Sequence, residues 1–83
     1  MTFTIEWPEP AYKELQKLPV LVRRAIVKKL DEAVQQPEHF FTRYVGKPYY
    51  KLRIGDYRAI VDLRFNERKA IVVAVGHRQN IYD

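Results

Sequence analysis

Hydrophobic and polar residues alternate at the start of the chain and then recur at helical spacing. Apolar and polar side chains alternate over Thr2–Trp7, which predicts a half-buried strand that ends at Pro8. Alanine and leucine recur every three or four residues over Pro10–Leu18, and a longer apolar stripe runs over Pro19–Gln36 until Pro37. Proline bounds these segments because it lacks the N–H that a helix interior requires. The first half therefore predicts one strand and a hairpin of two helices.

In the second half, aromatic and β-branched residues replace the helical pattern. The two richest runs are separated by Gly55-Asp56, a two-residue turn typical of a tight hairpin. The predicted elements are a loop over His39–Pro48, strands over Tyr49–Ile54, Tyr57–Arg64 and Ala70–Val75, and a polar tail over Gly76–Asp83. A chain of 83 residues has room for one domain. The order β-α-α-β-β-β predicts a single α+β domain over residues 1–83, with two N-terminal helices packed on one face of a mainly antiparallel sheet.

The predicted hairpin turn determines which residues face each other across its two strands. Partners lie at equal distances from the turn, so Arg53 faces Arg58, and Lys51 lies on the same side of the sheet. Like charges directly opposite each other cost roughly 0.2 to 1 kcal/mol, so three neighbouring cations indicate an anionic guest such as a phosphate group. The alternative is that one arginine pairs with Asp62 or Glu67 while the others point into water.

Positive charge is concentrated in the second half of the chain. There are 15 Lys and Arg against 10 Asp and Glu, which gives a net charge of +5. Residues 1–38 carry six basic and six acidic side chains, whereas residues 39–83 carry nine basic and four acidic ones and so hold the whole excess. This asymmetry indicates an anionic partner, and a basic surface kept for solubility is the alternative.

Composition excludes several kinds of site. The chain has no cysteine, so it has neither disulfide bonds nor a cysteine-based zinc site. Its two histidines, His39 and His77, lack the spacing of metal ligands, so we expect no metal and no cofactor. The start does not resemble a signal peptide, and no stretch approaches the roughly 20 apolar residues of a membrane span. We therefore expect a cytoplasmic protein without a membrane partner.

The predicted tail adds a cation, an imidazole and an aromatic ring beyond the last strand. These groups belong to Arg78, His77 and Tyr82. Cations beside an aromatic ring suit an unstacked RNA base better than duplex DNA, because a single-stranded base can lie flat on the ring. Tyr82 packed against the edge of the sheet is the alternative.

Two segments of the chain resemble the RelE branch of the RelE/ParE toxin superfamily, the small toxins of bacterial and archaeal toxin–antitoxin pairs. These segments are GKPYYKLRIGDYRAIV and the terminal VGHRQNIY, joined by a strand rich in valine and isoleucine. The resemblance covers nearly the whole chain. It implies a ribosome-dependent endoribonuclease that cuts mRNA without a metal, by attack of the ribose 2′-OH on the adjacent phosphate.

The resemblance also implies roles for individual residues. The implied catalytic set is Lys51, Arg53, Arg58, Arg78 and Tyr82. Beside this set, His77 is a further catalytic candidate, and we expect Lys47 and Arg43 to bind RNA. Arg58 and Arg78 would stabilise negative charge on the phosphate. Lys51 would assist removal of the 2′-OH proton, and Tyr82 would stack on the base. Arg53 stands where relatives often have lysine and is expected to act as an electrostatic clamp, whereas His77 is a candidate general acid because imidazole titrates near neutrality.

The expected partners are the ribosomal A site, mRNA and a RelB-like antitoxin. The antitoxin is expected to be acidic, because the toxin is basic, and to assemble with the toxin as a heterotetramer. The main alternative is a ParE-like toxin that inhibits a protein target such as DNA gyrase and performs no chemistry. A third interpretation is a non-catalytic protein that binds RNA or the ribosome.

Overall fold

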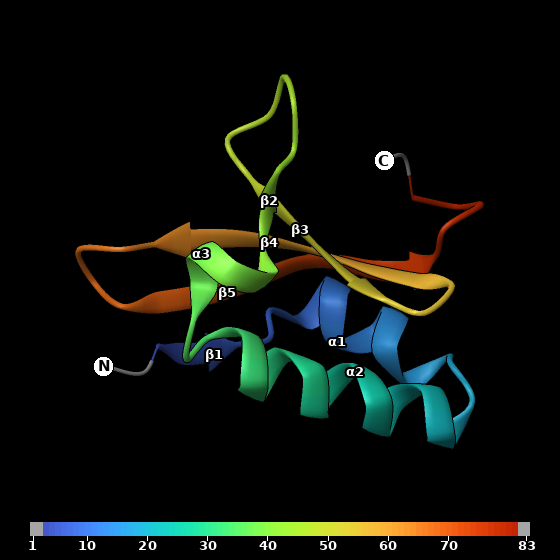
Figure 1. Cartoon of the computed structure of the whole chain (residues 1–83). Coiled ribbons are helices and arrows are strands. Elements are labelled where there is room, and N and C mark those ends of the chain that lie inside the picture. The colour runs from blue at the N-terminus through green and yellow to red at the C-terminus, as the bar shows by residue number, and fades with distance from the viewer. Residues whose placement is uncertain (1–2, 82–83) are drawn as a thin grey trace.

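A computed structural model describes residues 3–81 and shows a layer of helices against a five-stranded sheet (Figure 1). Along the chain the elements are β1 (Thr4–Glu6), α1 (Glu9–Gln16), α2 (Val20–Ala33), α3 (Pro37–Phe40), β2 (Thr42–Arg43), β3 (Tyr50–Ile54), β4 (Tyr57–Arg64) and β5 (Lys69–His77). The strand order is β1-β5-β4-β3-β2, with β1 parallel to β5 and all other neighbours antiparallel. The predicted α+β class is confirmed.

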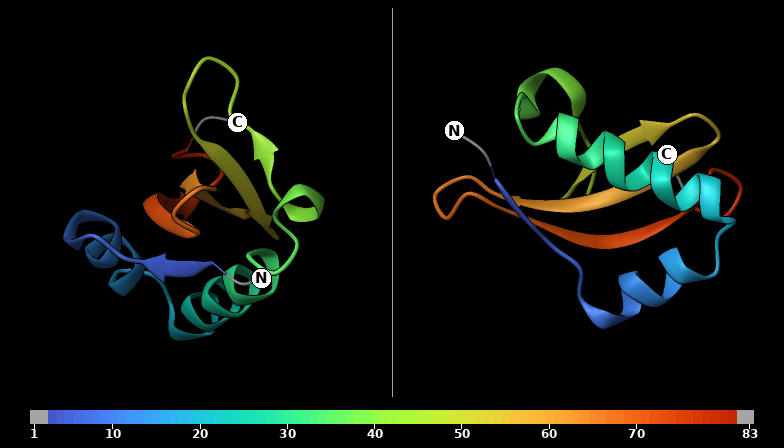
Figure 2. Two further views of the ribbon diagram at one scale, coloured as in Figure 1. Left: turned by 90° about the vertical axis from the view of Figure 1, so that its left-hand side faces the viewer. Right: turned by 90° about the horizontal axis from the view of Figure 1, so that it is seen from below.

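The two longer helices cover one face of the sheet. Helix α1 packs against β5, and α2 packs against β3 (Figure 2). Between the layers lie fully buried side chains from the helices and from three strands, namely Ile26, Leu30, Val34, Leu52, Val61 and Val72. The loop between β2 and β3 and the segment that follows β5 extend on the opposite side from the helices. The sheet therefore has one buried face and one face available for ligands.

The structure differs from the sequence prediction at two places. The predicted loop over His39–Pro48 contains the end of α3 and the strand β2, because a four-residue helix and a two-residue strand are too short to show a periodic pattern. The predicted polar tail is also wrong at its start, since Gly76 and His77 belong to β5 and pair with Arg58 and Tyr57. Gly76 and His77 are extended because their backbones pair with β4, whereas their side chains do not indicate a strand.

A β-bulge interrupts the pairing of β4 with β5. Ile60 pairs with Ala74 and the next residue, Val61, pairs with Val72, so Val73 is the extra residue on β5. A bulge turns successive side chains toward one face and bends the strand, and it is common beside functional sites. Here Val73 and Ala74 both line the face away from the helices.

Candidate functional site

Three cations meet at the hairpin formed by β3 and β4. Arg53 is paired with Arg58 across the two strands, which confirms the predicted register. The turn forms because Gly55 has a φ of 57°, a left-handed conformation that glycine adopts without steric cost. Arg53, Arg58 and Lys51 line one pocket of about 300 Å³ together with Thr42. We call this the basic pocket. It lies on the sheet face away from the helices, since the intervening residues of both strands belong to the core.

Arg58 is held firmly by the backbone of the turn. Its side chain is 3% exposed, and Nη1 donates hydrogen bonds to the carbonyl oxygens of Gly55 at 3.0 Å and Tyr57 at 2.9 Å. A guanidinium has five donors in a planar fork, so two bonds on one nitrogen fix the direction of the whole group. Arg58 is therefore a firmly held positive charge opposite the more exposed Arg53.

The acidic residues near the hairpin are engaged by another arginine. Arg64 Nε donates to Asp62 Oδ2 at 2.9 Å, and its Nη1 lies 3.6 Å from Glu67 Oε2. The hydrogen bond that Arg64 donates to Asp62, together with the negative charge of that carboxylate, raises the pKa of Arg64. Asp62 and Glu67, the carboxylates that were the alternative partners for the three cations, thus both interact with Arg64.

Arg78 is attached to the same hairpin turn but does not line the basic pocket. Its backbone N–H donates to the carbonyl of Asp56 at 2.8 Å, and its Nε lies 4.0 Å from Asp56 Oδ1. After Arg78 the chain turns back, since the N–H groups of Asn80 and Ile81 both point to the carbonyl of His77. A Cβ on Gly76 would lie 3.3 Å from Cδ1 of Ile81, so Ile81 packs over Gly76. Tyr82 lies outside the described residues.

Two of the site residues predicted from the sequence lie on the other face of the sheet. His77 pairs with Tyr57, and the two rings are 5.3 Å apart in an edge-to-face arrangement. Arg43 pairs with Tyr50 and lies over its ring at 5.5 Å. Tyr57 and Tyr50 both pack against the core. The structure therefore does not bring His77 or Arg43 to the basic pocket.

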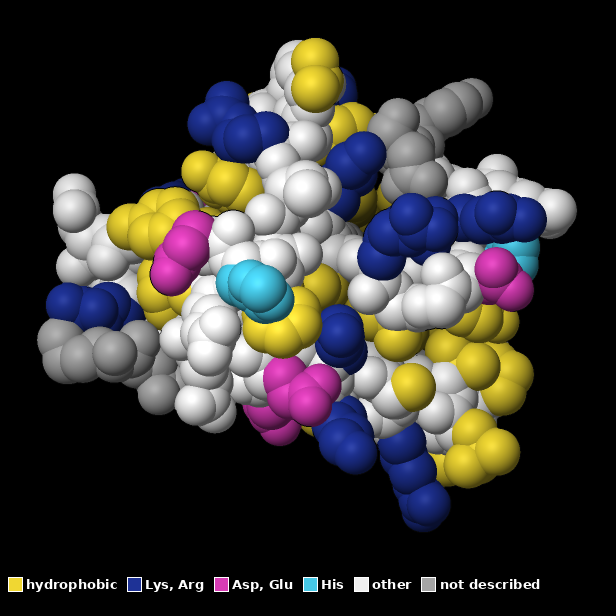
Figure 3. All heavy atoms as spheres, viewed as in Figure 1, with side chains coloured by type: hydrophobic (Ala, Val, Ile, Leu, Met, Phe, Trp, Pro, Cys, Tyr) yellow, Lys and Arg dark blue, Asp and Glu magenta, His cyan; other side chains and the backbone are white. Residues whose placement is uncertain are grey.

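A second pocket adjoins the basic pocket and was missed by the sequence analysis. It has a volume of about 290 Å³ and is lined by Tyr44, Lys47, Tyr49, Ile60, Val73, Ala74, Asn80 and Ile81. We call it the aromatic pocket. Lys51 connects the two, because its Nζ lies 5.8 Å from the centre of the Tyr44 ring. In Figure 3, Lys and Arg side chains are grouped over this part of the sheet, around β2 and β3. Tyr44 is brought opposite Tyr49 by the pairing of β2 with β3. The sequence does not predict this pocket, because it does not predict β2.

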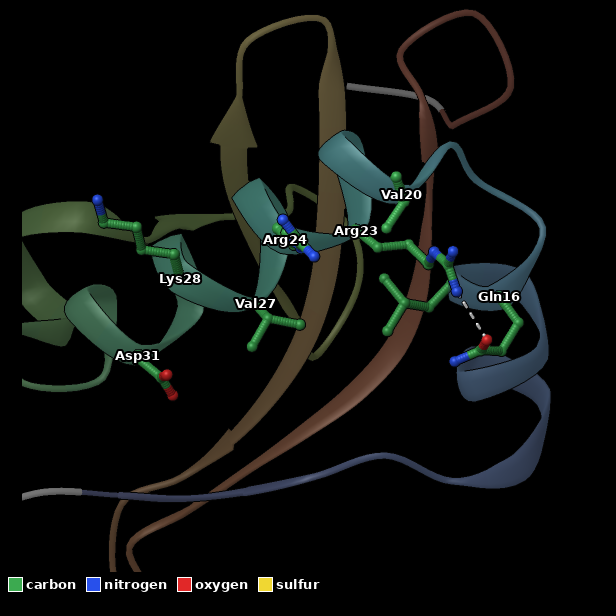
Figure 4. A pocket seen from close by; sticks show the side chains of 8 residues that line it. Gln16, Val20, Arg23, Arg24, Val27, Lys28 and Asp31 are labelled. Atoms are coloured by element: carbon green, nitrogen blue, oxygen red, sulfur yellow. Dashed lines mark hydrogen bonds between the residues drawn. The ribbon is translucent and has the colours of Figure 1, made fainter.

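A third hollow lies on the helices, on the opposite side of the sheet. This helix groove, of about 500 Å³, is lined by Leu15, Gln16, Val20, Arg23, Arg24, Val27, Lys28 and Asp31 (Figure 4). Arg23 reaches across it and donates to Oε1 of Gln16 at 2.9 Å, which links the two helices. Exposed valines with three cations around them make an amphipathic surface.

Two kinds of feature are absent from the part of the chain that the structure describes. Residues 3–81 contain no cluster of three or more histidine or acidic side chains able to hold a metal ion. Within the same residues, no helix is long and apolar enough to cross a membrane.

Comparison with known proteins gives a consistent result. A family model described as "ParE toxin of type II toxin-antitoxin system, parDE" matches residues 5–82. A comparison with curated proteins finds no match. Among solved structures, a free arginine mutant of the E. coli toxin RelE is 30% identical, with 96% of this chain and 87% of that chain covered and a TM-score of 0.78.

Two further solved structures are complexes. A RelE mutant of E. coli bound to a peptide of the antitoxin RelB is 31% identical, covering 93% of this chain and 84% of that chain at a TM-score of 0.73. The toxin–antitoxin complex RelBE2 of Mycobacterium tuberculosis is 21% identical, covering 94% of this chain and 100% of that chain, with a TM-score of 0.84. The latter likeness shows the fold.

Proposed function

The chain belongs to the RelE/ParE family of toxins from type II toxin–antitoxin systems, and on this premise we propose that it is a ribosome-dependent endoribonuclease that cleaves mRNA. The observation that supports cleavage is the basic pocket, in which Lys51, Arg53 and Arg58 surround a space large enough for one phosphate group. The strand register holds Arg53 opposite Arg58, and an anion between them would offset the repulsion between their like charges. No metal is required by this chemistry.

In the proposed reaction, the ribose 2′-OH attacks the adjacent phosphorus and the bond to the 5′ oxygen of the next nucleotide breaks. The products are a 2′,3′-cyclic phosphate and a 5′-OH. Lys51 assists removal of the 2′-OH proton, while Arg58 stabilises the negative charge that develops on the phosphate oxygens. Arg53 clamps the phosphate, because a guanidinium stays charged and is a poor proton donor.

Residues near the chain end complete the proposed site. Arg78 adds a further positive charge from the hairpin turn, and Tyr82 is proposed to orient the substrate base. The His77 ring packs against Tyr57 on the helix side of the sheet, which argues against His77 as the donor of a proton to the 5′ oxygen.

The test is expression of the toxin with its phosphate-binding arginines removed. We expect the wild-type protein to arrest growth and to produce cuts inside translated codons, and the Arg58→Ala plus Arg78→Ala double variant to reduce cleavage at least about 100-fold. Arg64→Ala plus Arg68→Ala is the matched control, since both residues are exposed, Arg64 is the last residue of β4, and Arg68 lies in the turn between β4 and β5. A double variant that folds normally yet remains fully toxic would falsify the nuclease assignment.

A second candidate is inhibition of a protein target such as DNA gyrase. The family model named for ParE toxins favours it. This activity would leave mRNA intact in the same experiment, and growth arrest would then depend on the protein target rather than on translation. A protein that only binds RNA or ribosomes would neither cut mRNA nor arrest growth.

We also propose that the chain is controlled by an antitoxin that occupies the helix groove. Relatives solved as complexes are bound to RelB antitoxins. The groove offers the valine side chains of Val20 and Val27, half-exposed to solvent, with Arg23, Arg24 and Lys28 beside them. These features fit an amphipathic segment that carries acidic residues on one side.

A further inference from the structure

Tyr44 and Tyr49 form a pair at the base of the loop between β2 and β3. The N–H of Tyr44 donates to the carbonyl of Tyr49 at 3.0 Å. The pairing of Thr42 with Lys51 continues to these two residues, so both rings lie on the face that carries Lys51. Both side chains are half-buried, and neither is among the residues that pack against the hydrophobic core. Their position is therefore not explained by the stability of the core.

The pocket beneath these rings has an apolar floor and a polar rim. The β-bulge turns Val73 toward the pocket, where it stays 37% exposed, beside the buried Ile60. Ile81 closes one side, and Lys47 and Asn80 supply polar groups. A volume of about 290 Å³ lies just below the range for small-molecule sites, about 300 to 1,000 Å³. Such a pocket suits a flat group with apolar faces and polar edges.

The aromatic pocket is joined to the basic pocket through one residue. Lys51 lines the basic pocket, pairs with Ile60 of the aromatic pocket and lies 5.8 Å from the centre of the Tyr44 ring. A phosphate and a base of the same nucleotide are separated by one sugar, so adjacent pockets of these two kinds fit one nucleotide.

We propose that the aromatic pocket binds the base next to the cleaved linkage of single-stranded RNA, by stacking on Tyr44 and Tyr49. This inference rests on the proposed function. A single-stranded base can leave its neighbours and lie on a ring, whereas a base in a duplex cannot. Lys47 and Asn80, at the rim, face the polar edge of the base and are placed to influence which base is accepted.

The test uses purified toxin and ribosomes programmed with three mRNAs. One carries normal nucleotides in the A-site codon, the second carries an abasic nucleotide on the 5′ side of the cleaved linkage, and the third carries one on the 3′ side. Single-turnover cleavage is measured against toxin concentration for the wild type, Tyr44→Ala, Tyr49→Ala and Tyr44→Phe. Tyr12→Ala is the matched control, because Tyr12 is 50% exposed on α1, away from the pocket. Melting temperatures verify that each variant is folded.

We expect Tyr44→Ala and Tyr49→Ala to raise the half-saturating concentration on normal mRNA roughly tenfold. On the matching abasic mRNA the same variants should behave like the wild type, because the base that they would hold is missing. Tyr44→Phe keeps the ring and should stay within about twofold of the wild type. Should the alanine variants not fold, the comparison of normal with abasic mRNA in the wild type and in Tyr44→Phe still measures the base contribution.

The possible failures are distinguishable. If the wild type cleaves none of the mRNAs, the proposed function is wrong. If it cleaves and the alanine variants match it on normal mRNA, the base pocket is wrong and the nuclease assignment stands. An equal loss on normal and abasic mRNA would assign the rings a role in supporting Lys51 and would also overturn base stacking.

Discussion

At the scale of single residues, Arg58 combines a structural role with its proposed catalytic one. It is buried, and its bonds to the carbonyls of Gly55 and Tyr57 hold the turn. Register alone was sufficient to place Arg58 beside Arg53 and Lys51, because equal distance from a two-residue turn determines cross-strand partners. Its burial could not be predicted, since an arginine on a ligand-facing strand is ordinarily exposed.

These bonds predict a difference in stability between two neighbouring arginines. Arg58→Ala should lower the free energy of unfolding by about 2 kcal/mol, because two partly buried carbonyl oxygens lose a donor and the buried Arg58 side chain leaves a cavity. Arg53→Ala should change it by less than about 0.5 kcal/mol, because Arg53 is exposed. Urea denaturation of both variants measures the difference. Equal effects would show that the turn does not depend on Arg58.

At the scale of elements, the long periodic segments were predicted well and the short ones were not. Strand β4 has the predicted bounds, Tyr57–Arg64, and both longer helices agree within three residues at each end. Strand β2 was missed because two residues show no alternation, and its pairing with β3 creates the aromatic pocket. The aromatic pocket, which depends on β2, could therefore not be predicted from the sequence. The basic pocket could be predicted, because it depends on the β3–β4 hairpin.

The helix groove carries a prediction about the antitoxin. Val27→Asp should weaken binding of the cognate antitoxin at least about tenfold, because it places a negative charge among the apolar contacts of an acidic partner. Toxicity of the free variant should be unchanged, since the groove is on the far side of the sheet from the basic pocket. Leu21→Asp is the control, because Leu21 is 73% exposed on α2 but does not line the groove. Isothermal titration calorimetry measures the antitoxin affinity of both variants, and equal affinities would exclude the groove as the antitoxin site.

At the scale of the whole molecule, the basic residues of the second half lie in two separate groups. Arg64 and Lys69 lie beside carboxylates at one end of the sheet. Lys51, Arg53 and Arg58 lie together on the open face, with Lys47 nearby. The sequence alone locates the positive excess in residues 39–83. Only the fold shows which of these cations lie at the end of the sheet and which lie together on its open face.

This arrangement predicts that ribosome binding depends steeply on salt. About four phosphate contacts give a slope near −3 in a plot of log affinity against log salt concentration, because each contact releases counterions. Lys47→Ala should reduce the slope by about 0.7, whereas Lys28→Ala, on the helix groove, should leave it unchanged. Binding measured at several salt concentrations and constant magnesium tests this. An affinity that is indifferent to salt would indicate an apolar interface.

The pairing of β1 with β5 affects when the protein becomes active during its own synthesis. β1 is synthesised well before its strand partner β5, which spans Lys69–His77 and also completes the pairing of β4. Contacts between residues so distant in sequence form late, because the intervening chain must first be ordered. A nascent chain that stops before β5 leaves the helices without the strand that α1 covers. Unfinished copies released by interrupted translation should therefore be harmless to the cell that makes them.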